Sequence, residues 1–279
     1  LRELPQILFS LEIPPVMNVM SALLLSVFLG LGTIWIKSKE ITDLLMQFQQ
    51  LVLQLVKRIL IPILPVYVAA NFCALAYEGS ISRLKVFLPV IFIVIVGHFL
   101  WLLLLYVLAS LYSKKNGWQV LRHYAPAYFT ALGTMSSAAT LGVALQCAHK
   151  SSVLDKEVAD FGVPLFANIH LCGSVLTATL FICVVSQLLY GHLPEFSTLV
   201  LFILLLGVFA VGAPGVPGGT VLASLGIVVS VLGFDDAGTA MLIAIFALQD
   251  SFGTACNVTG DGALTLMLDA YSRRNLKSE

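Results

Sequence analysis

The chain has 279 residues, of which 59% are apolar and only 11% are charged, and its formal net charge is zero. Soluble domains usually carry about a quarter charged residues, so this composition excludes an ordinary water-soluble fold. It predicts an all-α integral membrane protein that lies in the lipid bilayer of a plasma or inner membrane. Zero net charge gives no reason to expect a nucleic acid partner. Because the sequence begins with Leu1 rather than Met, we expect the natural N-terminus to lie upstream.

Three apolar segments predict transmembrane spans in the first part of the chain. They cover residues 12–36, 43–76 and 85–112, and each exceeds the roughly 18 residues that mark a spanning helix. The second segment is amphipathic and is interrupted by Pro62 and Pro65, which cannot donate helical hydrogen bonds. Since the N-terminus is expected upstream, these spans are a lower bound for the whole protein.

Two later segments, residues 117–150 and 197–235, are apolar but broken near their middle. The first break is a cluster of small and hydroxyl residues at 133–140, and the second is the Gly- and Pro-rich stretch 212–219. Each arm of the second segment has about 15 residues, or roughly 22 Å of helix, which is too short for a hydrocarbon core of about 30 Å. Lipid does not tolerate the unpaired backbone groups of such breaks. The sequence therefore predicts two re-entrant helical hairpins, a pattern that marks transporter binding sites.

Conventional helices are predicted at 157–190, between the hairpins, and at 238–272, after the second one. The flanks of the first hairpin are basic, whereas those of the second carry no Lys or Arg. By the positive-inside rule the first hairpin enters from the cytoplasm and the second from outside, so the two are oppositely oriented. Arg273 and Arg274 likewise predict a cytoplasmic C-terminus.

The last predicted helix contains a polar stripe formed by Asp250, Thr254, Asn257 and Asp261. The spacings of 4, 3 and 4 residues place them on one helical face. One interpretation is a stripe that neighbouring helices satisfy by hydrogen bonds. The interpretation we favour is a binding site, because carboxylates are costly in a membrane and are usually functional there. Their oxygens suit a small cation such as Na⁺, and an exposed carboxylate also suits a substrate ammonium group.

Other polar groups within the apolar segments extend this prediction. Ser136 and Ser137 in the first break, and the backbone of the second break, offer hydroxyls and helix N-termini that favour a carboxylate ligand. Asn168 and His170 lie near the middle of a predicted span and could mark local unwinding of the helix. For His170 a hydrogen-bonded core position and a proton-coupling role both remain open.

These residues resemble the dicarboxylate/amino acid:cation symporter family, which includes glutamate, neutral amino acid and serine/threonine transporters. The most specific match is Asp250-x-x-x-Thr254-x-x-Asn257-Val258-Thr259-Gly260-Asp261, which resembles the last transmembrane helix of the family. The segments Gly215-Val216-Pro217-Gly218 and Ser136-Ser137-x-x-Thr140-Leu141 resemble the tips of its second and first hairpins. The order of spans and hairpins also agrees with the family.

The resemblance implies a role for each matching residue. Asp250 would bind the α-ammonium group of an amino acid, Asn257 its carboxylate or a cation, and Asp261 a Na⁺ ion together with the Asn257 backbone. The remaining residues of the substrate pocket would be Ser136, Ser137, Val216, Pro217, Gly218 and Thr254. Residues 1–80 would form the end of a scaffold, and residues 81–279 most of a mobile transport domain. Family members are homotrimers that work by an elevator mechanism, and their first three helices have no counterpart in this chain.

Two departures from the family pattern bear on substrate and ion. Gly253 stands where members with acidic substrates have an arginine, so a buried second carboxylate would lack its cation. This predicts symport or exchange of a small neutral amino acid, with an acidic substrate as the alternative. The signature Asn-Met-Asp-Gly-Thr is replaced by His170-Leu171-Cys172-Gly173-Ser174, so coupling to H⁺ through His170 is an alternative to Na⁺.

Two other classes of protein are alternatives to a transporter. An intramembrane aspartyl protease needs two carboxylates that share a proton, but Asp250 and Asp261 lie eleven residues apart, roughly 16 Å along one helix. We therefore do not expect an enzyme. A transport-dead membrane sensor or structural protein would keep the hairpins without moving solute, and the altered signature leaves this alternative open.

Overall fold

The computed structural model describes residues 19–55, a few positions between 58 and 73, residues 80–211 and residues 218–275. Every element in these described ranges is a helix, as the sequence predicts. The chain divides into two compact units, Leu1–Glu78 and Gly79–Glu279. Each unit is described by itself below.

The first unit contains helices α1 (Val19–Ile36) and α2 (Lys39–Leu55). They are separated by Lys37, which has a left-handed backbone with φ of 52°, and by Ser38. The Ser38 hydroxyl accepts a hydrogen bond from the backbone N–H of Ile41 at 3.3 Å and so caps the start of α2. The predicted spans 12–36 and 43–76 both extend over residues outside the described ranges, so they stay predictions.

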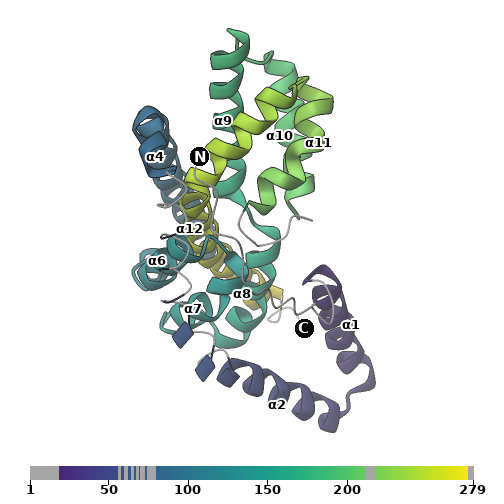
Figure 1. Cartoon of the computed structure of the whole chain (residues 1–279). Helices are drawn as coiled ribbons and strands as arrows, with labels where there is room; N and C mark the ends of the chain where they lie inside the picture. Colours follow the sequence, from purple (N-terminus) through teal and green to yellow (C-terminus); the bar gives the residue numbers. More distant parts are fainter. Residues whose placement is uncertain are drawn as a thin grey trace. The chain divides into compact units, whose positions relative to one another are not determined.

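The second unit is a bundle of nine described helices built around its last one. They are α4 (Ser80–Ser113), α5 (Trp118–Leu121), α6 (Ala125–Thr134), α7 (Ser137–His149), α8 (Lys156–Ile169), α9 (Cys172–Tyr190), α10 (Phe196–Val211), α11 (Gly219–Leu232) and α12 (Asp236–Asn275). Helix α12 packs against α4, α6, α8 and α9, and Figure 1 shows it crossing the middle of the bundle. Its residues are therefore placed to meet side chains from most of the unit.

Helix α12 is bent by 62° between Ala237–Ala247 and Gln249–Asn275. The two arms together cover the range predicted as a helix at 238–272. The N-terminal arm packs with α9, α10 and α11 around large apolar side chains, including the T-shaped pair Phe181–Phe246 with ring centres 6.5 Å apart. Because of the bend, the first arm of α12 packs in this apolar cluster while the second arm contacts α4, α6 and α8.

Two segments of the described chain are long and apolar enough to cross a membrane, Leu88–Ser113 and Lys156–Tyr190, and α12 makes a third if its bent arms count together. Helix α4 exposes large apolar side chains that suit a lipid surface. They include Phe92, Phe99, Leu100, Leu103 and Leu104. The prediction of an all-α membrane protein is confirmed at this level.

The predicted helix 157–190 is interrupted in the structure. Helix α8 ends at Ile169 and α9 begins at Cys172, and between them His170 has an extended backbone with φ of −111° and ψ of 96°. The ends of the two helices agree with the predicted span 157–190, and the local unwinding suggested by Asn168 and His170 is present. The cause lies in the partners that α12 offers to the freed backbone groups, described below.

The two broken segments form pairs of short helices. Helices α6 and α7 have 10 and 13 residues, α10 and α11 have 16 and 14, and the members of each pair pack against each other. Each is shorter than the roughly 20 residues that cross a bilayer. Their entry and return on one side of the membrane stays a prediction.

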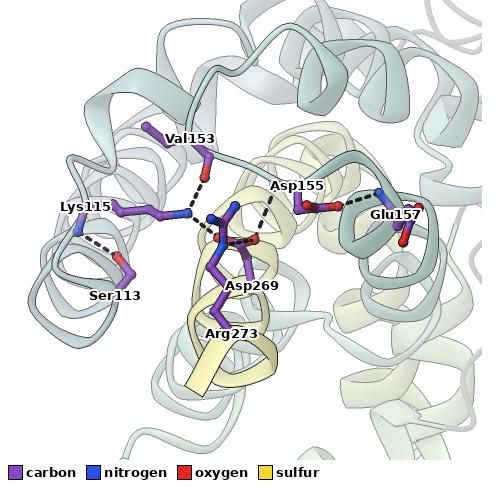
Figure 2. Close-up of polar contacts among 7 residues, drawn as sticks. All are labelled: Ser113, Lys115, Val153, Asp155, Glu157, Asp269 and Arg273. Carbon is purple, nitrogen blue, oxygen red and sulfur yellow. Dashed lines mark hydrogen bonds and ion pairs between the residues drawn. The ribbon is translucent and has the colours of Figure 1, made fainter. Parts of the chain in front are cut away.

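A buried carboxylate ties the C-terminal end of α12 to two neighbouring segments (Figure 2). Asp269 accepts a hydrogen bond from Lys115, and the Lys115 ammonium also donates to the carbonyl of Val153 at 2.6 Å. The other Asp269 oxygen accepts from the backbone N–H of Asp155 at 3.3 Å and from Nε of Arg273 at 3.1 Å. This Asp269 network joins α12 to the end of α4 and to the segment between α7 and α8.

Candidate functional site

The site begins at the interruption between α8 and α9. The first N–H groups of a helix have no partner within it and must be satisfied from elsewhere. Leu171, at the start of α9, provides no side-chain cap. The freed N–H groups of α9 therefore need an acceptor from another helix.

Asn257 of α12 is that acceptor. Its Oδ1 accepts hydrogen bonds from the backbone N–H groups of Gly173 at 2.7 Å and Ser174 at 3.3 Å, and its Nδ2 donates to the Ser174 hydroxyl at 2.9 Å. The helices approach so closely that a Cβ on Gly173 would lie 2.5 Å from both the Gly253 carbonyl oxygen and the Cys256 Cβ. Glycine is thus required at 173 for this joint to form.

Asp261, one turn further along α12, pairs with His170. The His170 Nδ1 lies 2.9 Å from Oδ1 of Asp261, whose side chain is fully buried. The other oxygen, Oδ2, has no hydrogen-bond partner among the described residues. The structure therefore joins the two predicted ion-site residues directly, across 91 positions of sequence.

Aromatic hydroxyls lie beside this pair. The Tyr106 hydroxyl of α4 donates to the carbonyl of Thr259 at 2.9 Å, and the Tyr124 hydroxyl is buried without a partner among the described residues. A Cβ on Gly262 would lie 2.7 Å from the Tyr106 hydroxyl oxygen and 2.8 Å from the Tyr124 ring, so both tyrosines pack closely on α12. Sequence reasoning missed both tyrosines, because a Tyr in an apolar segment is not distinguished from a packing residue.

Asp250 lies on the same arm of α12 as Asn257 and Asp261 but has a different partner. Its Oδ2 accepts a hydrogen bond from the backbone N–H of Gly218 at 2.6 Å, immediately before α11. Asp250 is buried, with 5% of its surface exposed, and no ion pair is found for it within the described ranges. Val216 and Pro217, also predicted for the site, lie outside the described residues.

The turn between α6 and α7 falls at the predicted serine cluster. Met135 has a left-handed backbone with φ of 52°, and Ser136 caps α7 by accepting from the N–H of Ala139 at 3.2 Å. Ser137 begins α7, and both serines are buried. The first two turns of α7 are thus organised locally, while α6 and α7 each pack on α12.

Thr254 completes the polar stripe on α12, and Gly253 precedes it in the chain. Thr254 is buried between Asp250 and Asn257. A Cβ on Gly253 would lie 3.3 Å from the Ser174 backbone N, Cα and hydroxyl. A larger side chain at 253 would therefore press on the start of α9.

An interrupted span and buried carboxylates on the last helix are features that mark functional sites in helical membrane proteins. The chain belongs to the sodium:dicarboxylate symporter family, whose model matches residues 3–271. The resemblance expected from the sequence motifs is thereby confirmed.

The names of similar proteins refer to different amino acid substrates. The chain is 29% identical over 168 residues to human excitatory amino acid transporter 1, covering 60% of this chain and 31% of that protein. It is 30% identical over 176 residues to mouse excitatory amino acid transporter 3, covering 63% and 33%. It is 28% identical over 181 residues to rat neutral amino acid transporter B(0), covering 64% and 32%. The match spans about a third of the length of these relatives.

Proposed function

We propose that the protein is a secondary active transporter that moves a small neutral amino acid together with a cation. The observation that carries the proposal is the environment of Asp250, a buried carboxylate without an ion pair among the described residues. A buried carboxylate is costly unless a positive group neutralises it. The α-ammonium group of an amino acid would supply that charge when it binds. Thr254, Ser136 and Ser137 would complete the pocket with Val216, Pro217 and Gly218.

The substrate class follows from the surroundings of Gly253. A dicarboxylate substrate would bring a second negative charge, which needs a cation in a buried site. Gly253 supplies none, and its contact with Ser174 supports a compact pocket. A small neutral amino acid agrees with these observations. Acidic amino acids are the alternative substrate class.

The mode of transport is proposed from the two pairs of short helices. In this proposal α6–α7 and α10–α11 are re-entrant hairpins that enter from opposite sides, and the second acts as the external gate. Residues 81–279 would form the transport domain, which moves as an elevator against a scaffold that includes residues 1–80, within a homotrimer. The C-terminus would lie in the cytoplasm of a plasma or inner membrane.

The coupling cation is proposed to act at Asp261 and Asn257. The family name supports Na⁺ as the cation, and H⁺ at His170 is the alternative. The unpartnered Oδ2 of Asp261 is an oxygen that a small cation could use. The amide of Asn257 contacts the start of α9, so its contribution to an ion would come through its backbone carbonyl.

The test is uptake of labelled serine, alanine and aspartate by the purified protein in liposomes, with imposed gradients of Na⁺ or H⁺. We expect gradient-driven uptake of serine or alanine, and little uptake of aspartate. Driven uptake of aspartate above the neutral amino acids would reverse the substrate assignment. Absence of flux and of binding under every gradient would favour a transport-dead membrane protein and refute the transport proposal.

A further inference from the structure

The pairing of His170 with Asp261 bears on which cation the proposed transporter can use. Asp261 is fully buried, and an ionised carboxylate in such a place requires a donor or a positive charge close by. The imidazole of His170 already provides one, with Nδ1 at 2.9 Å from Oδ1. Because an ionised carboxylate only accepts hydrogen bonds, the ring N–H must be the donor.

The His170 ring is held in this position from two sides. Its backbone N–H donates to the carbonyl of Phe166 at 2.8 Å, which fixes the residue at the end of α8. The ring itself lies against Gly260, where a Cβ would come within 2.7 Å of Cε1. The backbone of α12 and the last turn of α8 therefore direct the imidazole at Asp261.

A Na⁺ ion needs several oxygen ligands, and it cannot approach an oxygen through an N–H that already points at it. The obstruction exists in either protonation state of the ring, since the N–H that donates to Asp261 is present in both the neutral tautomer and the cation. A protonated, positively charged ring would also repel Na⁺. Of the two Asp261 oxygens, only Oδ2 has no hydrogen-bond partner within the described part of the chain.

We infer that His170 is a cation-specificity residue whose imidazole takes the place of Na⁺ beside Asp261. Of the two cations proposed for this site, the inference therefore selects H⁺ over Na⁺. This inference rests on the proposed transport function. It concerns only the binding of Na⁺, so it can be tested without an amino acid substrate. It predicts that removal of the imidazole creates a Na⁺ site at Asp261. Na⁺ sites elsewhere in the protein are unaffected by it.

The test compares thermal unfolding of the purified protein in NaCl and in choline chloride at the same ionic strength. A ligand that binds only the folded state raises its melting temperature. We expect the Na⁺-specific rise in His170→Asn to exceed that of the wild type by about 5 °C. This additional rise should vanish in the double variant His170→Asn/Asp261→Asn. His170→Gln serves as a second variant if His170→Asn does not fold.

His149 offers a matched control, because it also pairs with an aspartate. Its Nε2 lies 2.6 Å from Asp160, but both side chains are about a quarter to a third exposed, between α7 and α8. His149→Asn should leave the Na⁺ response of the wild type unchanged. An unchanged response in His170→Asn and His170→Gln, or a wild-type response that Asp261→Asn removes, would overturn the inference. Lack of amino acid binding in the wild type would instead refute the proposed function.

Discussion

The Asp250 carboxylate accepts a 2.6 Å hydrogen bond from the backbone N–H of Gly218. Gly218 has a left-handed backbone with φ of 73° and directly precedes α11, so this bond joins α12 to the start of the second helix of the α10–α11 pair. A ligand that binds Asp250 would therefore lie next to the start of α11. The contact offers a direct route from substrate binding to the position of the proposed gate.

Asp250→Asn should abolish amino acid binding while the protein still folds and enters the membrane. The amide can still accept from Gly218, but it no longer attracts an ammonium group. The check is binding of labelled alanine or serine to purified protein, with Asp160→Asn as the control. Asp160 is partly exposed and pairs with His149 of α7. Binding at wild-type affinity in Asp250→Asn would refute its role in the site.

Gly173→Ala should destabilise the bundle, because the added methyl group would lie 2.5 Å from a backbone oxygen and a Cβ on α12. Overpacking of this kind typically costs about 1–3 kcal/mol. Gly226→Ala is the matched control, since its Cβ would have no atom within 4 Å and alanine favours a helix. Thermal unfolding of the two variants gives the comparison. Equal stability of both would show that α9 does not approach α12 this closely.

Lys115→Met should be more destabilising than Arg273→Ala, although both residues bind Asp269. The Lys115 side chain is 25% exposed and Arg273 is 52% exposed, whereas Asp269 is fully buried. Loss of the more buried partner of a buried carboxylate costs about 3 kcal/mol, whereas an exposed partner is worth less than about 1 kcal/mol. Melting temperatures measured in the same detergent would decide the order. The reverse order would mean that Arg273 is the main counter-charge.

Acid should weaken the contact between the end of α9 and the start of α12. The backbone N–H of Gly238 and the hydroxyl of Tyr190 both donate to Asp235 at 2.8 Å, and together they lower the pKa of this carboxyl. A lowered pKa means that the contact stabilises the fold above the ordinary carboxyl pKa of about 3.9 and is lost as the pH falls through the lowered pKa.

Asp235→Asn provides the comparison for this pH dependence. The amide can keep the hydrogen bond with Gly238 but does not titrate. The melting temperatures of wild type and variant should differ by a constant amount above about pH 5, and the difference should shrink below about pH 4. A difference that is independent of pH down to pH 3 would contradict the assignment.

The helices and turns that depend on local sequence were predictable. Apolar length located α4, and the cap at Ser136 falls within the small and hydroxyl cluster that marked the first break. The interruption at His170 was suggested by polar residues within an apolar segment. In each case the signal lies within a few residues of the feature that it predicts.

Features that depend on distant partners were not predictable from one sequence. The spacing of Asp250, Asn257 and Asp261 indicates a shared helix face but not which helix each residue meets. Asn257 serves the start of α9, and Asp261 meets a histidine 91 residues earlier. The first arm of the bent helix α12 likewise joins an apolar cluster whose other members come from distant helices. Asp269 pairs with Arg273 within one helix, but its contact with Lys115 joins positions 154 residues apart.

The bond from Asn257 to the start of α9 also sets an order of events during synthesis. Gly173 leaves the ribosome 84 residues before the side chain that accepts its N–H. At about 5–20 residues per second, this gap lasts roughly 4 to 17 seconds. During that time the backbone N–H groups at the start of α9 lack their acceptor on α12, and lipid cannot satisfy them. A chain whose synthesis stops in this interval would carry inserted apolar helices with an open polar joint, a target for membrane quality control.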